Sequence, residues 1–276
     1  MTCDARYWGK PKTLTRRGSL LHYWVCGPND APLVVLTHGA SMDHRLFDAQ
    51  LGALLEAGYR VLGWDVRGHG YSKPIGSACR VPVVVEDLIA ILDRLEASEV
   101  VVVGQSFGGY VSQELLFRYP DRVTAICVVG ATDLTQLPSR LEYVALRLSP
   151  SLFRIWPDRH LRRLVADRTA ETESAKRYAH AATCQLSKRE FVAVWKAVAT
   201  ALHAEPGYVI DRPLLLVHGE HDATGTIARD APSWADRVPN CRYEVIPNAG
   251  HNANQDNPEA FNRVLLEFLD LHAPTR

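Results

Sequence analysis

Strand-like and helix-like segments alternate along most of this 276-residue chain. Helices are predicted where apolar residues recur at spacings of three and four, namely at Asp48–Ala57, Val83–Leu95, Phe107–Tyr119 and Pro258–Leu271. Short apolar runs bounded by turn residues predict buried parallel strands, namely Leu33–Thr37, Arg60–Trp64, Val100–Gly104, Thr124–Gly130, Pro213–His218 and Cys241–Pro247. The predicted class is therefore α/β, a doubly wound and mostly parallel sheet with helices on both faces. An antiparallel hairpin over Thr13–Cys26, turning at Arg17-Gly18, is expected to precede it.

The alternation breaks after Asp133 and resumes near Pro213. We predict a helical lid over residues 134–208, inserted after the sixth strand, with residues 1–133 and 209–276 forming the core. Its expected helices are Arg140–Leu148, Arg159–Ala166, Glu171–His180 and Lys188–His203. Residues 134–210 hold 12 Lys/Arg against 7 Asp/Glu. This excess belongs either to solvated outer helix faces or to a surface that attracts an anionic substrate.

The strongest chemical signal is the run from Val101 to Gly109, in which a β-branched strand leads directly into Gly-x-Ser-x-Gly and then a helix. A serine on such a turn adopts a strained backbone conformation, and the flanking glycines let strand and helix approach closely. Ser106 is therefore the predicted nucleophile. The pattern is weak by itself and gains its specificity from the strand before it and the helix after it.

A serine hydroxyl needs a base to take its proton, and the base needs a group to orient it. Of eleven histidines, His251 follows the last predicted strand and is the expected base. Asp222 ends the strand before that and is the expected acid, in the chain order Ser, Asp, His. Asp133, at the end of another strand, is the alternative acid, and its default interpretation is a hinge or helix-capping residue.

Acyl transfer also needs hydrogen-bond donors for the developing oxyanion. The backbone N–H groups of Phe107, directly after the nucleophile, and Ala40, in the turn after the first parallel strand, are the predicted donors. His38 and His218 each stand at a strand end before a glycine. We interpret both as hydrogen-bonded structural histidines.

The composition of the chain restricts the binding partners and the cellular compartment that we expect for it. The 31 basic and 31 acidic side chains cancel, so no overall field attracts nucleic acid or an anionic membrane. The six scattered cysteines form no Cys-x-x-Cys pair, which favours reduced thiols. No signal peptide or membrane-spanning run is visible. We expect a soluble cytoplasmic protein acting on a small molecule.

Together these motifs resemble the α/β-hydrolase family, in its lid-bearing esterase, lactonase and epoxide-hydrolase-like branch. The similarity spans nearly the whole chain and includes the segments 38–40, 64–72, 104–109, 219–222 and 250–251. In that branch, epoxide hydrolases and haloalkane dehalogenases carry an aspartate where this chain has Ser106. The resemblance therefore implies a serine hydrolase of esters, thioesters or lactones. It implies no catalytic role for Asp65–Ser72, a structural turn in these relatives.

Two other functions stay open. Cofactor-independent dioxygenases of hydroxyquinolones keep a serine and a His–Asp pair, and residues 43–47 are faintly similar to theirs. Other relatives are hormone receptors or regulators that bind more than they turn over. Walls for a substrate pocket are expected from aromatic residues of the lid and from residues below it, namely Tyr143, Phe153, Trp156, Tyr178, Trp195, Phe107 and Leu46. No cofactor and no metal is expected, since no paired ligand spacing such as His-Glu-x-x-His occurs.

Overall fold

The computed structural model describes residues 8–273. Its centre is an eight-stranded sheet in the order β1-β2-β4-β3-β5-β6-β7-β8, parallel from β4 to β8 and antiparallel at β1 and β2. The strands are β1 (Lys12–Arg16), β2 (Ser19–Cys26), β3 (Leu33–Thr37), β4 (Arg60–Asp65), β5 (Val100–Gln105), β6 (Val123–Val129), β7 (Leu214–Gly219) and β8 (Cys241–Ile246). The predicted α/β class, doubly wound and mostly parallel, is confirmed.

The hairpin of β1 and β2 turns where the sequence predicts. Arg16 pairs with Ser19, so Arg17 and Gly18 form a two-residue loop. Both have positive φ, 46° and 77°, as the tightest hairpin turns require.

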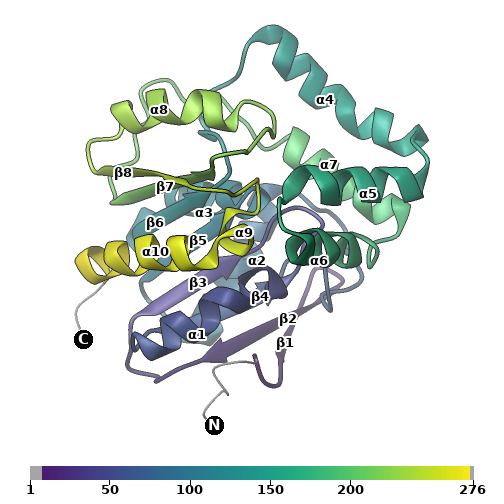
Figure 1. The fold of residues 1–276 in the computed structure, drawn as a ribbon. Helices are drawn as coiled ribbons and strands as arrows, with labels where there is room; N and C mark the ends of the chain where they lie inside the picture. Colours follow the sequence, from purple (N-terminus) through teal and green to yellow (C-terminus); the bar gives the residue numbers. More distant parts are fainter. Residues whose placement is uncertain (1–7, 274–276) are drawn as a thin grey trace.

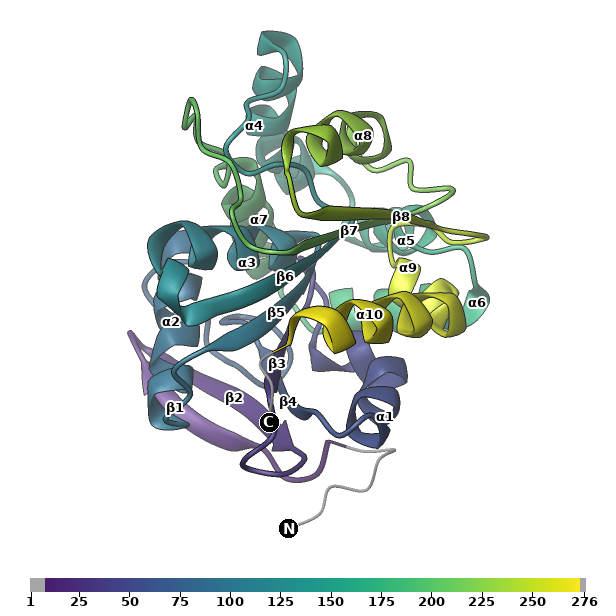
Figure 2. The ribbon, with the colours of Figure 1, turned by 90° about the vertical axis from the view of Figure 1, so that its left-hand side faces the viewer.

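Helices cover both faces of the sheet (Figures 1 and 2). Side chains alternate along each strand, so Val102 points to one face and Val101 and Val103 to the other. The first face packs on α2 (Val81–Arg94), α3 (Phe107–Arg118) and α8 (Ile227–Arg237). The second packs on α1 (Asp48–Glu56) and α10 (Pro258–His272), which follows the short α9 (Ala253–Asp256). The sheet is thus buried on both sides, as its continuous apolar strands predict.

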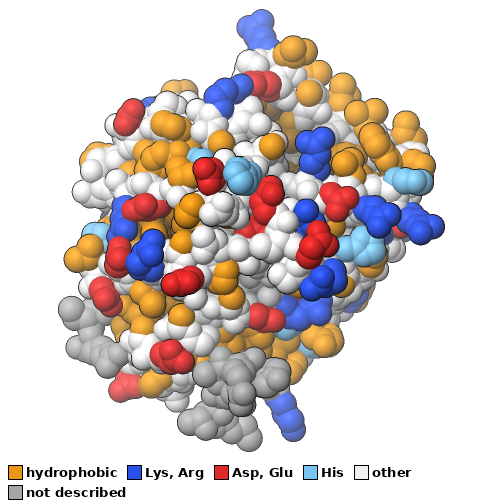
Figure 3. Space-filling view, viewed as in Figure 1, with side chains coloured by type: hydrophobic (Ala, Val, Ile, Leu, Met, Phe, Trp, Pro, Cys, Tyr) orange, Lys and Arg blue, Asp and Glu red, His pale blue; other side chains and the backbone are white. Residues whose placement is uncertain are grey.

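Four helices lie between β6 and β7, in the interval where the sequence breaks its alternation: α4 (Arg140–Ile155), α5 (Asp158–Thr169), α6 (Glu173–Thr183) and α7 (Lys188–Ala199). Capping boxes at Ser139 with Glu142 and at Ser187 with Glu190 fix the starts of α4 and α7. The group lies to one side of the sheet, and α4 projects from the molecule in both ribbon views. Hydrophobic side chains are exposed along its outer edge (Figure 3).

One of the described cysteines is not a reduced thiol, contrary to the prediction from the sequence. Cys26 is disulfide-bonded, so the prediction of reduced thiols throughout the chain is wrong there. Cys79, Cys127, Cys184 and Cys241 are free, and Cys3 lies outside the described residues. Within residues 8–273, no helix has the length and apolar character needed to cross a bilayer.

Candidate active site

Ser106 occupies the sharp turn between β5 and α3. Its φ of 53° and ψ of −113° define a backbone conformation that residues other than glycine rarely adopt. The turn is held by the Ser106 amide, which donates to the carbonyl of Val129 at 2.7 Å. A Cβ on Gly108 would lie 2.0 Å from the carbonyl oxygen of Thr37. Glycine is therefore required there, and α3 can start close against the sheet with the serine at its tip.

His251 and Asp222 meet at the carboxyl edge of the same sheet. The imidazole donates from Nδ1 to Oδ2 of Asp222 at 2.9 Å, and both side chains are buried. Burial by itself would raise the pKa of the Asp222 carboxyl, but the facing imidazole and the hydrogen bond from the Thr224 amide outweigh it, so the pKa lies below its usual range. The carboxylate is therefore ionised and fixes which ring nitrogen carries the proton.

Asp133, the alternative acid, points elsewhere. Its Oδ1 accepts hydrogen bonds from the amide and hydroxyl of Thr135, at 2.9 and 2.8 Å. Its Oδ2 pairs with Arg237 at 3.1 Å. These contacts match the capping and hinge interpretation and leave Asp222 as the carboxylate that contacts His251.

Of the two predicted oxyanion donors, Phe107 directly follows Ser106 in the chain and Ala40 lines the same cavity as Ser106. Phe107 starts α3, where backbone N–H groups lack partners within the helix. His38 donates from Nδ1 to the carbonyl of Gly39 at 2.8 Å. Because a trans peptide directs its C=O and N–H to opposite sides, the Ala40 N–H points away from that contact. Neither amide donates a hydrogen bond within the described part of the chain.

The histidines at the other strand ends have structural contacts. His38 accepts from the Val66 amide through Nε2 at 3.0 Å, and burial lowers its pKa. Burial also lowers the pKa of His69, to about 3, and this ring accepts from the Ser41 amide. His218 contacts the Gly219 carbonyl and the Tyr243 hydroxyl. The hydrogen bonds of these three rings organise the turns around the site.

Two positioning residues were missed by sequence reasoning. Gln105, next to the nucleophile, donates to the His251 carbonyl at 3.1 Å. Asp256 accepts from the amides of Gly250, Glu171 and Thr172 at 2.8 to 3.0 Å. The first joins the serine turn to the histidine loop, and the second joins that loop to α6. The only sequence signal was the place of Gln105 inside Gly-x-Ser-x-Gly.

Ser106, His251 and Ala40 line a cavity of about 790 Å³. Phe153 and Trp195 line it as predicted, with ring centres 5.2 Å apart. Its other apolar walls include Met42, Leu146, Val165, Val198, Leu202, Ile227 and Trp234. Charged side chains are also present, with Glu142 paired to Arg229 at 2.6 Å between α4 and α8. The cavity is thus bounded by the sheet edge, α8 and the helices inserted after β6.

The remaining pocket predictions are corrected by the structure. Leu46 is fully buried in the core on the α1 face. Tyr143 and Trp156 lie away from the cavity, because α4 turns a different side of its surface toward it. The Tyr178 hydroxyl bonds to Asp43 instead, and the Phe107 side chain is buried between helix and sheet.

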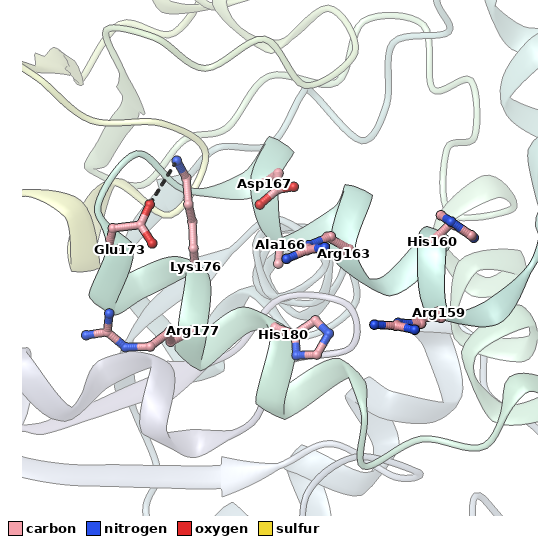
Figure 4. Close-up of a pocket in the computed structure, with 9 residues that line it drawn as sticks. All are labelled: Arg159, His160, Arg163, Ala166, Asp167, Glu173, Lys176, Arg177 and His180. Atoms are coloured by element: carbon pink, nitrogen blue, oxygen red, sulfur yellow. Dashed lines mark ion pairs between the residues drawn. The ribbon is translucent and has the colours of Figure 1, made fainter.

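A second hollow, of about 630 Å³, lies between α5 and α6 (Figure 4). Its lining combines four cations, two imidazoles, two carboxylates and one alanine: Arg159, Arg163, Lys176, Arg177, His160, His180, Asp167, Glu173 and Ala166. No hydroxyl or thiol lines it. Of the two cavities, the first is therefore the one lined by serine and threonine hydroxyls. Among residues 8–273, no cluster of three or more His, Cys, Asp or Glu could hold a metal ion.

Comparison with known proteins decides the family. Residues 32–258 match the model of the alpha/beta hydrolase fold. The chain belongs to this family. The α/β-hydrolase is 37% identical to RutD of Variovorax paradoxus, provisionally described as a carbamate hydrolase, over 90% of this chain and 96% of that protein. It is 25% identical to 3-oxoadipate enol-lactonase 2 of Acinetobacter baylyi, over 92% and 94%.

Solved structures agree on the fold of this α/β-hydrolase. The enol-lactonase from Burkholderia xenovorans superimposes with a TM-score of 0.80 at 23% identity, covering 94% of this chain and all of that one. The resemblance that the sequence motifs indicate is thereby confirmed at the level of the family.

Proposed function

We propose that this chain is a serine hydrolase that cleaves a carboxylic ester, thioester or lactone through an acyl-enzyme. The observation that carries the proposal is the hydrogen bond from His251 to Asp222 at 2.9 Å, in a site whose cavity also holds Ser106 on a strained turn. An oriented imidazole in the same cavity as a partly exposed serine is the arrangement that activates a hydroxyl for acyl transfer.

The steps follow from the positions of the groups. While its Nδ1–H stays hydrogen-bonded to the Asp222 carboxylate, His251 takes the Ser106 proton through Nε2 as the serine oxygen bonds to the acyl carbon. The amides of Ala40 and Phe107 bind the resulting oxyanion. The imidazolium returns its proton to the departing alkoxide or thiolate. Water, deprotonated by the same imidazole, then releases the acid and restores the serine.

The cavity favours a substrate with an apolar acyl or alcohol portion. Phe153, Trp195 and Leu146 offer apolar surface from α4 and α7, and Trp234 offers more from α8. Its volume of about 790 Å³ lies within the range of small-molecule sites. Burial of a bulky apolar group against this aromatic wall is favourable by several kcal/mol of binding free energy. Esters that carry such a group should therefore be preferred over short ones.

Residues 134–208 are proposed to act as a lid. Glu142, Leu146 and Phe153 of α4 and Trp195 of α7 border the cavity that also holds Ser106. The Glu142–Arg229 ion pair connects α4 to α8 across this cavity. Opening of α4 would widen the entrance without moving the sheet edge that carries the triad.

Nothing in the site favours the dioxygenase alternative. Residues 43–47, which carry that similarity, are turned into the structure. His44 contacts Asp65 at 2.8 Å and stacks on Trp24, while Leu46 and Phe47 are fully buried. None of these residues lines the cavity with Ser106.

Labelling with a fluorophosphonate tests the proposal. The purified protein should be labelled at Ser106 and should hydrolyse an aryl ester without added metal, with Ser149→Ala as a control that removes another cavity hydroxyl. Labelling at a different residue, or activity abolished by a chelator, would contradict the assignment.

A further inference from the structure

Helix α4 carries a continuous apolar stripe that faces solvent. Successive residues of an α-helix are about 100° apart, so the stripe residues fall within about 40° of one line along it. They are 53% to 80% exposed: Leu141, Val144, Leu148, Leu152 and Ile155. The cavity-lining residues of α4, such as Leu146 and Phe153, lie on a different side. The stripe is therefore separate from the substrate site.

Single exposed leucines are common on protein surfaces, but a contiguous apolar row of this length on one projecting helix is not. The described residues leave it uncovered. Figure 3 shows it as a ridge of hydrophobic side chains along α4. Trp156, which ends the helix, is 45% exposed beside it. A half-exposed tryptophan at the end of such a row is typical of segments that reach the boundary between water and lipid.

One edge of the stripe is cationic. Arg140, Arg147 and Arg154 recur every seven residues and so fall on one side of the helix, about 80° to 120° from the stripe. None of them forms an ion pair within the described residues, although Arg147 lies over the Tyr143 ring at 5.8 Å. Glu142, the helix's acidic residue, is already paired with Arg229. The stripe is thus bordered by positive charge that has no counterion among residues 8–273.

The charge extends into the next helix. Helix α5 begins two residues after Trp156, and with α6 it forms the hollow whose four cations exceed its two carboxylates. Lys176 is paired there with Glu173 at 3.8 Å, and the other three cations are Arg159, Arg163 and Arg177. The space-filling view shows Lys, Arg and His side chains on the same face as the hydrophobic ridge. The net charge of zero arises because this excess is balanced elsewhere, so it hides a strongly uneven distribution.

We propose that α4 binds the surface of an anionic lipid bilayer, with its apolar stripe inserted at the headgroup boundary and its arginines on the lipid phosphates. A helix with an apolar face and basic edges lies in the plane of such an interface. A second copy of this chain fits the surface less well. In an antiparallel pairing, the one-sided arginine row would face the same row of its partner, and like charges repel.

Vesicle co-sedimentation of the full chain tests the proposal. We expect binding to vesicles of equal parts phosphatidylcholine and phosphatidylglycerol, weakening with salt, and little binding to phosphatidylcholine alone. Leu148→Ser with Leu152→Ser should lower the partition coefficient about tenfold, because both apolar contacts are lost. Arg147→Gln with Arg154→Gln should lower binding to the anionic vesicles about tenfold.

Matched variants elsewhere serve as controls. Leu271→Ser removes another leucine that is 73% exposed, and Arg94→Gln removes an exposed arginine of α2, so neither should change partitioning. Hydrolysis of a water-soluble ester and the thermal midpoint should stay unchanged in the stripe variants, which shows that they fold. Equal binding to both kinds of vesicle, or no binding to either, overturns the proposal. So does a concentration-dependent dimer that Leu148→Ser with Leu152→Ser converts to a monomer.

Discussion

The edge of the sheet and the helices inserted after β6 both border the cavity, but they are held in different ways. At the sheet edge, Ser106 is forced into positive φ, and a Cβ on Gly108 or Gly130 would press on the Thr37 carbonyl or the His251 ring. On α4, by contrast, Leu146 and Phe153 are only partly buried. The chemistry rests on backbone geometry that tolerates little change, whereas the wall of the cavity rests on side chains that can be exchanged.

This contrast predicts that a small change at the sheet edge has a far larger effect than a similar one on the inserted helices. Asp256 connects the two regions and should give an intermediate effect. We therefore expect the size of the effects to fall from the sheet edge to the inserted helices.

Removal of the nucleophile should have the largest effect. Ser106→Ala deletes the atom that forms the acyl bond in the proposed mechanism, so turnover on the best ester should fall by about 10⁴ to 10⁶. Ser149→Ala, on α4 in the same cavity, should stay within a few-fold of wild type. Oxygen consumption should be monitored with acid release. A Ser106→Ala variant that keeps a tenth of wild-type turnover would instead support an oxygenase mechanism, in which the serine at most donates a hydrogen bond.

Exchange of the orienting carboxylate comes next. Asp222→Asn leaves the His251 ring in the wrong tautomer and should reduce turnover by about 10⁴. Asp133→Asn affects a capping contact and a partly exposed ion pair, so turnover should change little. Steady-state kinetics of both variants under identical conditions decide between the two acids. The reverse order of the two losses would make Asp133 the catalytic acid.

The link between the regions should show in stability as well as in rate. Asp256→Ala leaves the buried amide of Gly250 and the partly buried amides of Glu171 and Thr172 without their acceptor. We expect the free energy of unfolding to fall by about 3 kcal/mol and turnover to fall with it, because the His251 loop loses its anchor. Urea unfolding measures the first quantity. The control is Asp236→Ala, which removes an acidic residue of α8 outside the cavity lining. An equal loss of stability and turnover in that variant would contradict the anchoring role of Asp256.

The cavity wall should show a smaller and more selective effect. Phe153→Ala removes apolar surface that faces the substrate, so KM for an ester with a bulky apolar acyl group should rise about tenfold while kcat changes little. Trp156→Ala, three residues further along the chain and outside the cavity, should leave KM unchanged. Equal effects would restore the earlier expectation that Trp156 lines the pocket.

The smallest predicted effect is the pH dependence of stability that comes from Asp222. Its pKa in the folded protein lies below its ordinary value of 3.8. The carboxylate therefore stabilises the folded state fully above that value and loses this contribution as the pH falls through the lower, folded pKa. The stability difference between wild type and Asp222→Asn should be constant from neutral pH down to about 4 and shrink below it. A difference that grows on acidification would have the wrong sign.

Local signals in the sequence predicted the sheet, most helices and the serine turn. Buried strands appear in the sequence as apolar runs. The glycines around Ser106 directly indicate a tight turn in which strand and helix approach closely. Helices α8 and α9 were missed, since α8 contains Pro232 and α9 spans one turn. The spacing of apolar residues predicted a helix at α4, but it did not indicate which side of that helix faces the cavity. For that reason Tyr143 and Trp156 were assigned to the pocket and Leu146 was not.

The sequence by itself determined the family, the nucleophile turn and two carboxylates at strand ends, because each depends on residues adjacent in the chain. Only the tertiary structure decided which carboxylate meets His251, because that depends on Thr135 and Arg237 holding Asp133 away. It also decided the anchoring of the His251 loop by Asp256, whose partners Glu171 and Thr172, just before α6, lie 85 and 84 residues earlier in the chain. Contacts between segments so far apart are set by packing, and no spacing along the chain encodes them.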